Sequence, residues 1–372
     1  FFQYKLKSLD FTPLKPFIFL YGAQLIMIPF HSSVPIDYQL SMIRSDFMSS
    51  LLLPFAIHNV MHNDKKTVSS FTITMLCIII VTSGYSLFLT TMAGFNPYML
   101  ALLPLNDQEF NDVYALASDG GRVFGRISGV FTHPMINGLF LAFSFIFIIS
   151  KLNLKKLLSN KLLSILLFVV FITILLIGVR SAIVALGIGV VFYLLIEKKI
   201  NLILASLLGL SLIYFVALSI PGMSDYMNSI VDPESSNVKG SSIEMRLEQF
   251  DGCMKEIESN PAFGKGYAWT NYYKENKGGH PTMLSFESLF IVILSNSGFV
   301  GLFIWIVMLI MYYKLIKKNL DITKFRILLA LMLLYISYSM ITGEYGYLRY
   351  FTIFYILIWN SELNYFKSKR NV

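Results

Sequence analysis

The chain has 372 residues, of which 55% are hydrophobic and only 14% are charged. This composition excludes a large water-soluble domain and is typical of a protein that crosses the membrane several times. The net charge of +8 would suit a nucleic-acid-binding protein, but the lysines stand in short clusters between apolar runs, as in cytoplasmic loops of membrane proteins. We therefore attribute the basic charge to membrane topology and expect no nucleic-acid partner. Cys77 and Cys253 form neither a disulfide framework nor a metal-ligand pattern.

Apolar runs long enough to cross a bilayer recur along the whole chain. A helical span needs roughly 20 apolar residues, with about 17 as the lower limit. By this criterion we predict an all-α integral membrane protein, 1–372 as a single membrane domain, with a polytopic bundle of about 10 or more transmembrane helices. The predicted spans lie near residues 14–32, 46–62, 67–94, 128–150, 162–179, 181–197, 200–220, 287–312, 326–342 and 345–362. The first two are the weakest, because they are interrupted by Pro13, Pro16, Pro29 and Pro54.

The short basic clusters predict the orientation of these spans. They fall at 64–66, 151–161, 197–199, 314–324 and 367–370, and the predicted spans put all of them on one side. By the positive-inside rule this side is cytoplasmic, and both termini lie there. The external face carries residues 95–127 and a long polar loop, 221–286. Within this loop we expect a short helix at 242–257, capped by Ser241 or Ser242 and ended by Asn260-Pro261. Because the sequence begins with Phe1, we expect a trimmed N-terminus, and no signal peptide is recognisable.

One arginine, Arg180, stands inside the nearly uninterrupted apolar stretch 162–196. A guanidinium in hydrocarbon costs roughly 2.5 to 3.5 kcal/mol on insertion scales, so it is tolerated only where water, a charged partner or a ligand meets it. The predicted topology places Arg180 at a tight external turn between two spans. The same external face receives the other unusual ionisable residues: Arg122, Arg126, His133, Arg246, His280, Glu287, Glu344 and Arg349. This clustering predicts a single site at the outer leaflet.

Four stretches share a recognisable order and spacing over residues 120–310. They are "GRISGVFTHPMINGLFLA", "LLIGVRSAIVALGIG", "MRLEQFDGCMKEIESNPAFGKGY" and "ESLFIVILSNSGFVGLF". Together they resemble the bacterial polysaccharide (O-antigen) polymerase and O-antigen ligase superfamily, membrane glycosyltransferases that use undecaprenyl-diphosphate-linked sugars outside the cytoplasmic membrane. The first stretch departs from the family pattern by Met135 and Ile136, inserted before Asn137. In the second, Val179 replaces the serine before Arg180. The third matches at Arg246, Asn260, Pro261, Gly264 and Gly266.

The fourth stretch separates two activities within this superfamily. When Gly298 and Gly301 are aligned with the family pattern, Glu287 occupies the position at which ligases carry a histidine, and His280 lies further upstream. A glutamate here is more similar to the repeat-unit polymerases, so we favour a polymerase. The resemblance implies a GT-C-like bundle with short helices in its long external loop. It also implies metal-independent transfer, with inversion at the anomeric carbon, of a growing chain onto the non-reducing end of a new lipid-linked repeat unit.

The resemblance also implies the partners and the location of the protein. The partners are an undecaprenyl-diphosphate-linked oligosaccharide donor and acceptor, membrane lipid, and a chain-length regulator protein as a further candidate. The location is the bacterial cytoplasmic (inner) membrane, with the active site facing the periplasm or the cell exterior. The product would be O-antigen, capsule or exopolysaccharide.

The residue types on the external face suit this chemistry. As the glycosidic bond breaks, the leaving lipid diphosphate gathers negative charge, and guanidinium groups bind phosphate oxygens bidentately while staying charged. We predict that Arg180 and Arg246 bind the diphosphate, with Arg126 and Arg122 as the next candidates. The external segments contain no Asp-x-Asp run, so we predict no metal site and no cofactor.

Two residues are candidate general bases for the acceptor hydroxyl. Glu287 is favoured by its position in the motif. His280 is favoured because the unperturbed pKa of a histidine lies near neutral pH, where a general base works best. Each candidate has a structural alternative: Arg180 as a hairpin cap or snorkelling side chain, Arg246 as a solvated helix residue, His280 as a loop residue in a turn, and Glu287 as a carboxylate at a helix N-terminus. His133 is expected to hydrogen-bond a backbone carbonyl beside Pro134. Glu344 and Arg349 are expected to pair with each other or to support the diphosphate site.

Three other functions compete with the polymerase. A transporter or flippase of lipid-linked oligosaccharide would place charges near the bilayer midplane and show two similar halves, and the sequence shows neither. A ligase that transfers finished polymer to a lipid A core or a protein is disfavoured by the glutamate at position 287. A structural scaffold would not need several external arginines in or near membrane spans.

Overall fold

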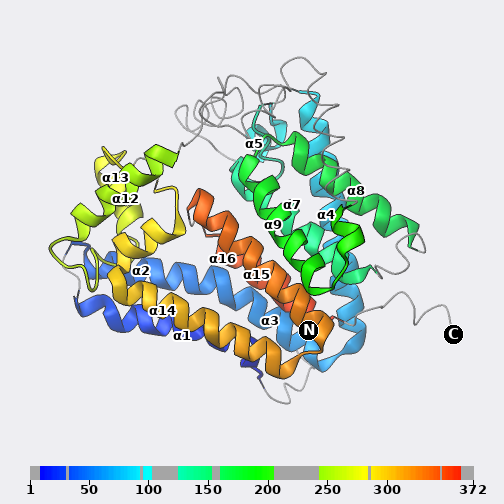
Figure 1. Cartoon of the computed structure of the whole chain (residues 1–372), viewed down its shortest axis with the longest axis horizontal. Helices are drawn as coiled ribbons and strands as arrows, with labels where there is room; N and C mark the ends of the chain where they lie inside the picture. The colour runs from blue at the N-terminus through cyan, green and yellow to red at the C-terminus, as the bar shows by residue number, and fades with distance from the viewer. Residues whose placement is uncertain are drawn as a thin grey trace. The chain divides into compact units, whose positions relative to one another are not determined.

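A computed structural model describes residues 9–30, 33–92, 95–102, 125–152, 160–204, 243–283, 286–343 and 346–361. Every regular element within these ranges is helical, which confirms the predicted all-α class (Figure 1). The helices are α1 (Lys15–Met27), α2 (Ile36–Phe47), α3 (Leu53–Asn63), α4 (Lys65–Thr90), α5 (Pro97–Leu102), α7 (Pro134–Lys151), α8 (Lys161–Leu176), α9 (Arg180–Ile196), α12 (Ile243–Ile257), α13 (Trp269–Lys277), α14 (Leu289–Asn319), α15 (Ile322–Thr342) and α16 (Tyr347–Asn360). The short helix predicted at 242–257 is α12.

Six helices in the described part of the chain are long and apolar enough to cross a membrane. They are Thr12–Phe30, Ile36–His62, Lys66–Thr90, Pro134–Lys151, Leu289–Asn319 and Ile322–Thr342. Two shorter apolar helices, α8 and α9, occupy the spans predicted at 162–179 and 181–197. The helix α16, with 14 residues, occupies the one predicted at 345–362. Most of the span predicted at 200–220 lies outside the described residues. A membrane bundle is therefore supported, and the count of ten or more helices stays a prediction.

The second span begins at Ile36, well before the predicted start at residue 46. The helices α2 and α3 are continuous through a π-helical turn, Met48–Leu52, which lies just before Pro54. A proline inside a helix leaves the carbonyl four residues earlier without its usual partner. Here that carbonyl belongs to Ser50, and it accepts a hydrogen bond of 2.7 Å from the hydroxyl of Thr352 on α16. The prediction of a short span was wrong because a distant side chain replaces the bond that Pro54 removes.

The chain forms two compact units. The first unit comprises 1–73, 247–328 and 343–372, and the second comprises 74–246 and 329–342. In the first unit α1 packs along α14, and α16 packs against α3 (Figure 1). Its interior holds a group of aromatic rings in mutual contact: Phe17, Tyr312, Phe351 and Tyr355. In the second unit α7 packs against α8 and α9.

The long helix α14 is broken at Gly298, where φ is 60° and ψ is −160°. Only glycine adopts this backbone conformation readily. The break frees backbone carbonyls before it and amides after it, and the segment 260–266, which follows α12, bonds to both sets. Four backbone hydrogen bonds make this junction: Lys265 to Ser295 at 2.9 Å, Gly266 to Asn296 at 2.8 Å, Phe299 to Pro261 at 3.0 Å and Val300 to Ala262 at 2.9 Å, donor named first.

Two glycines allow the segment 260–266 to approach α14 this closely. A Cβ atom on Gly298 would lie 2.5 Å from the carbonyl oxygen of Ala262, and one on Gly264 would lie 2.6 Å from the amide nitrogen of Gly298. Both contacts are with backbone atoms, which cannot turn away as a side chain can. The Asn-Pro-x-x-Gly-x-Gly motif and the Gly-x-x-Gly motif are therefore two halves of one backbone junction in the first unit.

Candidate functional site

Arg126 lies in the short segment that leads into α7, and its backbone position is set by the next residue. The amide of Ile127 donates to the carbonyl of Ile177 at 3.1 Å. The carbonyl of Ile127 accepts from Nδ2 of Asn137 at 3.1 Å. Gly129, with φ of 61°, leaves no room for a side chain, because a Cβ there would lie 2.9 Å from the same Nδ2. The glycine and asparagine of the first sequence motif thus hold the segment that carries Arg126.

Arg180 is the first residue of α9, at the predicted turn between two apolar helices. The turn passes through Gly178, which has φ of 73°, and Val179 at the helix N-cap. The hydrogen bond between Ile127 and Ile177 joins this turn to the segment carrying Arg126. Two of the predicted diphosphate-binding arginines therefore lie on adjoining segments, and both side chains are half-buried.

Arg246 lies on α12 and reaches the last turn of α15. Its Nη1 and Nη2 atoms donate to the carbonyls of Met340 at 3.4 Å and Ile341 at 3.0 Å. A cation is favoured at a helix C-terminus, where the unpaired carbonyls carry partial negative charge. The side chain is half-buried and hydrogen-bonded, so the solvated alternative does not describe it.

The end of α15 also contacts the starts of α7 and α9. The hydroxyl of Tyr338 donates to the carbonyl of Met135 at 2.6 Å, and the Tyr338 and Ser181 side chains are hydrogen-bonded. Because Ser181 follows Arg180, the three arginines lie around contacting segments of the second unit. We call Arg126, Arg180 and Arg246 the arginine cluster. Arg122, the fourth predicted member, lies outside the described residues.

His133 is the N-cap residue of α7. Its Nδ1 atom accepts a hydrogen bond from the amide of Met135 at 3.2 Å. The expected bond to a backbone carbonyl is therefore wrong: the first amides of a helix lack partners, and an acceptor at the N-cap satisfies one of them. Burial and, to a smaller extent, the Arg126 guanidinium lower the pKa of His133. The ring is therefore neutral at neutral pH and does not add to the positive charge of the arginine cluster.

His280 is buried in the first unit, and both of its ring nitrogens have partners. Nδ1 accepts from the amides of Thr282 at 3.2 Å and Met283 at 3.0 Å. Nε2 lies 3.4 Å from Oε1 of Glu256. These contacts put the ring proton on Nε2 and occupy the lone pair on Nδ1, so no lone pair remains for a substrate hydroxyl. The ring also packs against Trp269, Tyr273 and Phe286. This geometry favours the structural alternative for His280.

Glu287 is half-buried at the entry to α14, in the first unit. The residue before it, Phe286, is fully buried and has φ of 54°, a rare conformation for a bulky residue. Such strain persists only where surrounding structure imposes it, and it is common at functional sites. Burial lowers the pKa of Lys274, and the carboxylate of Glu287 acts in the opposite direction. Glu287 is thus held at a helix N-terminus within the electrostatic reach of one ammonium group.

Arg349 lies on α16 in the first unit, and its charge acts on Asp46 of α2. Asp46 also accepts a hydrogen bond of 2.7 Å from the hydroxyl of Tyr267. The pairing predicted for Arg349 involves Glu344, which lies outside the described residues. Asp46 was not predicted from the sequence, although a carboxylate within a helix that can cross a membrane is itself a signal of a functional site.

Asp46 lines a pocket of about 350 Å³ within the first unit. The polar side chains of the pocket wall are Tyr21, Gln24, Asp46, Ser50, Tyr267, Thr270, Asn271, Asn296 and Ser297, and Trp305 adds an aromatic surface. Some of these groups orient one another: Ser297 donates to Gln24 at 2.8 Å, and Asn296 accepts from the amide of Thr270 at 3.0 Å. Amides, hydroxyls and a carboxylate offer both donors and acceptors to a ligand rich in hydroxyl groups.

The predicted site residues divide between the two units. Glu287, His280 and Arg349 lie in the first unit, and the arginine cluster and His133 lie in the second. The structure places Arg126, Arg180 and Arg246 on contacting segments of one unit, and the contacts of His280 favour its structural alternative. That one site draws on both units stays a prediction.

These features describe an all-α membrane protein with a half-buried arginine cluster and a polar pocket. Residues 162–306 match the profile of a family described as O-Antigen ligase. The matched part runs from α8 into α14 and contains Arg180, Arg246, His280 and Glu287. No curated protein matches the sequence. Together with the apolar helices, the match supports a bacterial membrane protein and a glycosyltransferase-like enzyme of the O-antigen ligase-like superfamily.

Proposed function

We propose that the protein is a polysaccharide polymerase that transfers a growing undecaprenyl-diphosphate-linked glycan onto the non-reducing end of a new lipid-linked repeat unit. The observation that carries the proposal is the arginine cluster. Its three half-buried arginine side chains come from three separate chain segments. Arg180 and Arg246 lie inside the part that matches the O-Antigen ligase profile. A membrane protein keeps such charges together in an apolar unit where an anion meets them.

The arginine cluster would bind the diphosphate of the donor. Guanidinium groups match phosphate oxygens bidentately, and at a partly dehydrated interface they stabilise the charge that develops on the leaving group. No metal is required for this step. The bond between the anomeric carbon and the phosphate oxygen breaks, and undecaprenyl diphosphate leaves with the bonding electrons.

Glu287 is our candidate for the general base. Its carboxylate would take the proton from the acceptor hydroxyl, whose oxygen then attacks the anomeric carbon from the opposite face and inverts its configuration. A glutamate at this position resembles the polymerases, and the contacts of His280 leave Glu287 as the better candidate. This residue difference favours a polymerase over a ligase.

The polar pocket beside Asp46 is our candidate for a sugar subsite. Its volume of about 350 Å³ can hold a sugar ring, and its donors and acceptors come from α1, α2, the π-helical turn after α2, α13, the segment before α13, and α14. Asp46→Asn keeps the shape of the side chain and removes the charge that acts on Arg349. We expect this variant to raise the KM for the acceptor more than it lowers kcat.

The experiment is polymerisation of purified lipid-linked repeat units by the protein in liposomes, with products separated on a gel. We compare wild type with Arg180→Ala, Arg246→Ala and Glu287→Gln, with Arg44→Ala as the control because Arg44 is exposed and outside the arginine cluster. Each arginine of the cluster should contribute about 10²- to 10³-fold in rate, as other groups that stabilise developing charge do. Arg44→Ala should keep the wild-type ladder, and the ladder should survive EDTA in folded protein.

The result that would overturn the role of Arg180 is full activity of Arg180→Ala, which would make this residue a hairpin cap. Transfer of finished polymer to a lipid A core by wild type, with no ladder, would identify a ligase. Movement of the lipid-linked unit across the liposome membrane, with no new glycosidic bond, would identify a transporter.

A further inference from the structure

A second group of titratable side chains lies in the first unit, apart from every residue discussed above. Asp10 precedes α1, and His58 and His62 lie one helical turn apart on α3. One ligand atom from each of the three, a carboxylate oxygen or a ring nitrogen, lies within 4.8 Å of the others. Two histidines at positions i and i+4 share a helix face, which is a common arrangement for binding a metal ion.

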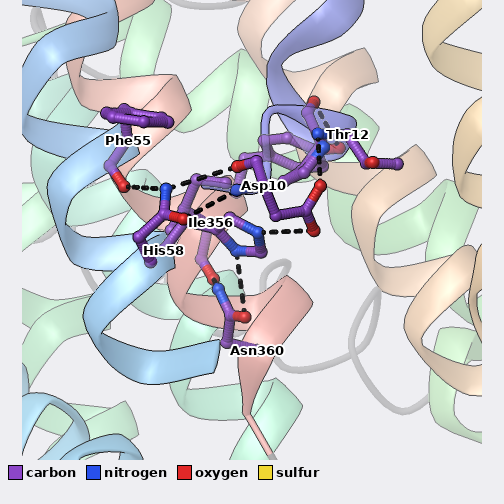
Figure 2. A network of polar contacts seen from close by, with 9 residues as sticks. Asp10, Thr12, Phe55, His58, Ile356 and Asn360 are labelled. Atoms are coloured by element: carbon purple, nitrogen blue, oxygen red, sulfur yellow. Dashed lines mark hydrogen bonds and ion pairs between the residues drawn. The ribbon is translucent and has the colours of Figure 1, made fainter. Parts of the chain in front are cut away.

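His58 is fully buried, and an oxygen atom faces each of its ring nitrogens. Nδ1 lies 3.1 Å from Oδ1 of Asn360, and Nε2 lies 3.1 Å from Oδ2 of Asp10. Figure 2 marks both contacts with dashed lines. The Asn360 amide has a fixed orientation, because its Nδ2 donates to the carbonyl of Ile356 at 2.9 Å. Oδ1 of Asn360 must therefore accept, and the ring proton of neutral His58 sits on Nδ1.

This tautomer points the Nε2 lone pair of His58 at the carboxylate of Asp10. Two electron-rich atoms at 3.1 Å repel each other unless a cation stands at that position, either a second ring proton or a metal ion. A fully buried imidazolium carries a large desolvation cost. A ring N–H held by an outer oxygen is the arrangement by which proteins orient a metal-bound histidine, so that the lone pair of the other nitrogen faces the ion.

Asp10 is held in place as firmly as His58. Its amide donates to Oδ1 of Asn59 at 2.8 Å, and its carbonyl accepts from Nδ2 of Asn59 at 3.3 Å. The carboxylate oxygen that faces away from His58 accepts from the amide of Thr12 at 2.8 Å. Its backbone and one carboxylate oxygen are thus fixed, and the other oxygen is directed at His58.

We propose that Asp10, His58 and His62 bind a zinc ion. Zinc lies about 2.0 to 2.2 Å from nitrogen and oxygen ligands in tetrahedral sites, so neighbouring donors stand roughly 3.4 Å apart, close to the separation of Asp10 and His58. The imidazole of His62 is exposed, which allows it to close on the ion and lets water fill the fourth position. Asn360 acts as the outer partner that orients His58.

The zinc ion would be structural and remote from Glu287. From Leu289 to Tyr312 the helix α14 rises roughly 35 Å, at about 1.5 Å per residue. The ring of Tyr312 contacts Tyr355 at 5.2 Å, and the hydroxyl of Tyr355 donates to the carbonyl of Pro13 at 3.0 Å, close to Asp10. The site therefore lies at the opposite end of α14 from Glu287. It fastens the start of the first span to the end of the second and, through Asn360, to the end of α16.

The test is metal analysis of the full-length protein purified without a histidine tag. After mild chelation and dialysis against zinc, wild type should retain about one zinc per chain by plasma mass spectrometry, as a structural site does. His62→Ala and Asp10→Asn should retain none, and Asn360→Ala should bind zinc about 10- to 100-fold more weakly. Cys77→Ser is the control for adventitious binding, because this exposed thiol is outside the cluster, and it should keep the wild-type content.

Thermal unfolding gives a second readout. Zinc should raise the Tm of wild type and of Cys77→Ser but leave the Tm of His62→Ala unchanged, since His62 is exposed and its loss need not disturb the fold. Equal zinc content in wild type and His62→Ala would overturn the proposal and leave an Asp10–His58 ion pair. Ladder synthesis is scored separately: folded His62→Ala should polymerise normally, and loss of polymerisation with zinc would overturn the structural role.

Discussion

Replacing Gly298 by alanine tests the junction between α14 and the segment 260–266. The added Cβ would meet the carbonyl oxygens of Pro261 and Ala262, each at 2.5 Å, in a backbone conformation that alanine adopts only with strain. The strain costs about 1 to 3 kcal/mol. Moving the two carbonyls also weakens the hydrogen bonds that they accept from the amides of Phe299 and Val300. We expect a loss of about 2 to 6 kcal/mol, a large part of the 5 to 15 kcal/mol that stabilises most proteins.

Gly22→Ala is the matched control for this substitution. Gly22 lies inside α1 of the same unit, and a Cβ there would meet nothing within 4 Å. Alanine at an unhindered helical position should be neutral or stabilise the protein by up to about 1 kcal/mol. The Tm of each variant in detergent, measured by intrinsic fluorescence, gives the comparison.

Cys253 reports whether the loss is local to the junction. Its thiol is fully buried, and Sγ lies 3.2 Å from Oγ of Ser295, next to the broken part of α14. In a Cys77→Ser background, maleimide should label Cys253 in Gly298→Ala much faster than in Gly22→Ala. Equal Tm values and equal protection of Cys253 in the two variants would refute the steric reasoning.

Three further predictions concern other contacts. Thr352→Val should lower stability by about 1 to 3 kcal/mol, because the carbonyl of Ser50 loses its replacement partner, whereas Thr352→Ser should stay near wild type in a Tm comparison. Because burial lowers the pKa of His133 in the folded state, the unfolded state binds more protons below about pH 6.5, so stability should fall as pH falls from 6.5 through the lowered pKa. Urea titrations at several pH values in this range should show the free energy of unfolding of wild type falling as the pH falls. The dependence on pH should be weaker in His133→Asn, which keeps an N-cap acceptor. The Glu287 carboxylate raises the pKa of Lys274, so Glu287→Gln should lower that pKa further and make Lys274 react faster with an acylating reagent near pH 8. Unchanged reactivity of Lys274 would show that the charge of Glu287 does not act on it.

Regular patterns in the sequence predicted a large part of this fold. The apolar runs located the helices, and the polar pattern after residue 241 located α12 because an amphipathic helix with a following Asn-Pro has few other interpretations. The start of the second span was wrong for a physical reason. The effect of Pro54 depends on whether another group satisfies the carbonyl of Ser50, and that group, Thr352, lies about 300 residues away.

The candidate site was predictable to a smaller extent. Arg180 and Arg246 stand out because charge in an apolar stretch is costly, and the structure brings Arg126 to the same segments. The role of His280 was not predictable, because only the fold shows that two backbone amides occupy its Nδ1. Asp46 had a sequence signal that went unused, an acidic residue within an apolar helix.

The zinc ligands also had a signal, the spacing of His58 and His62 on one helix. Their third partner, Asp10, could not be inferred, because nothing in the sequence pairs residue 10 with residue 58. Three-dimensional contact between the start of the chain and α3 supplies that information.

The break in α14 bears on how the protein is made. At the break the helix leaves carbonyls and amides without helical partners, and each such group costs several kcal/mol in hydrocarbon. Residues 260–266 satisfy them, and the ribosome synthesises these residues before it reaches α14. The complementary segment is therefore already present when the broken helix enters the bilayer. In a circular permutation that moved α14 ahead of this segment, the broken helix would enter the bilayer before the groups that satisfy its free carbonyls and amides had been synthesised.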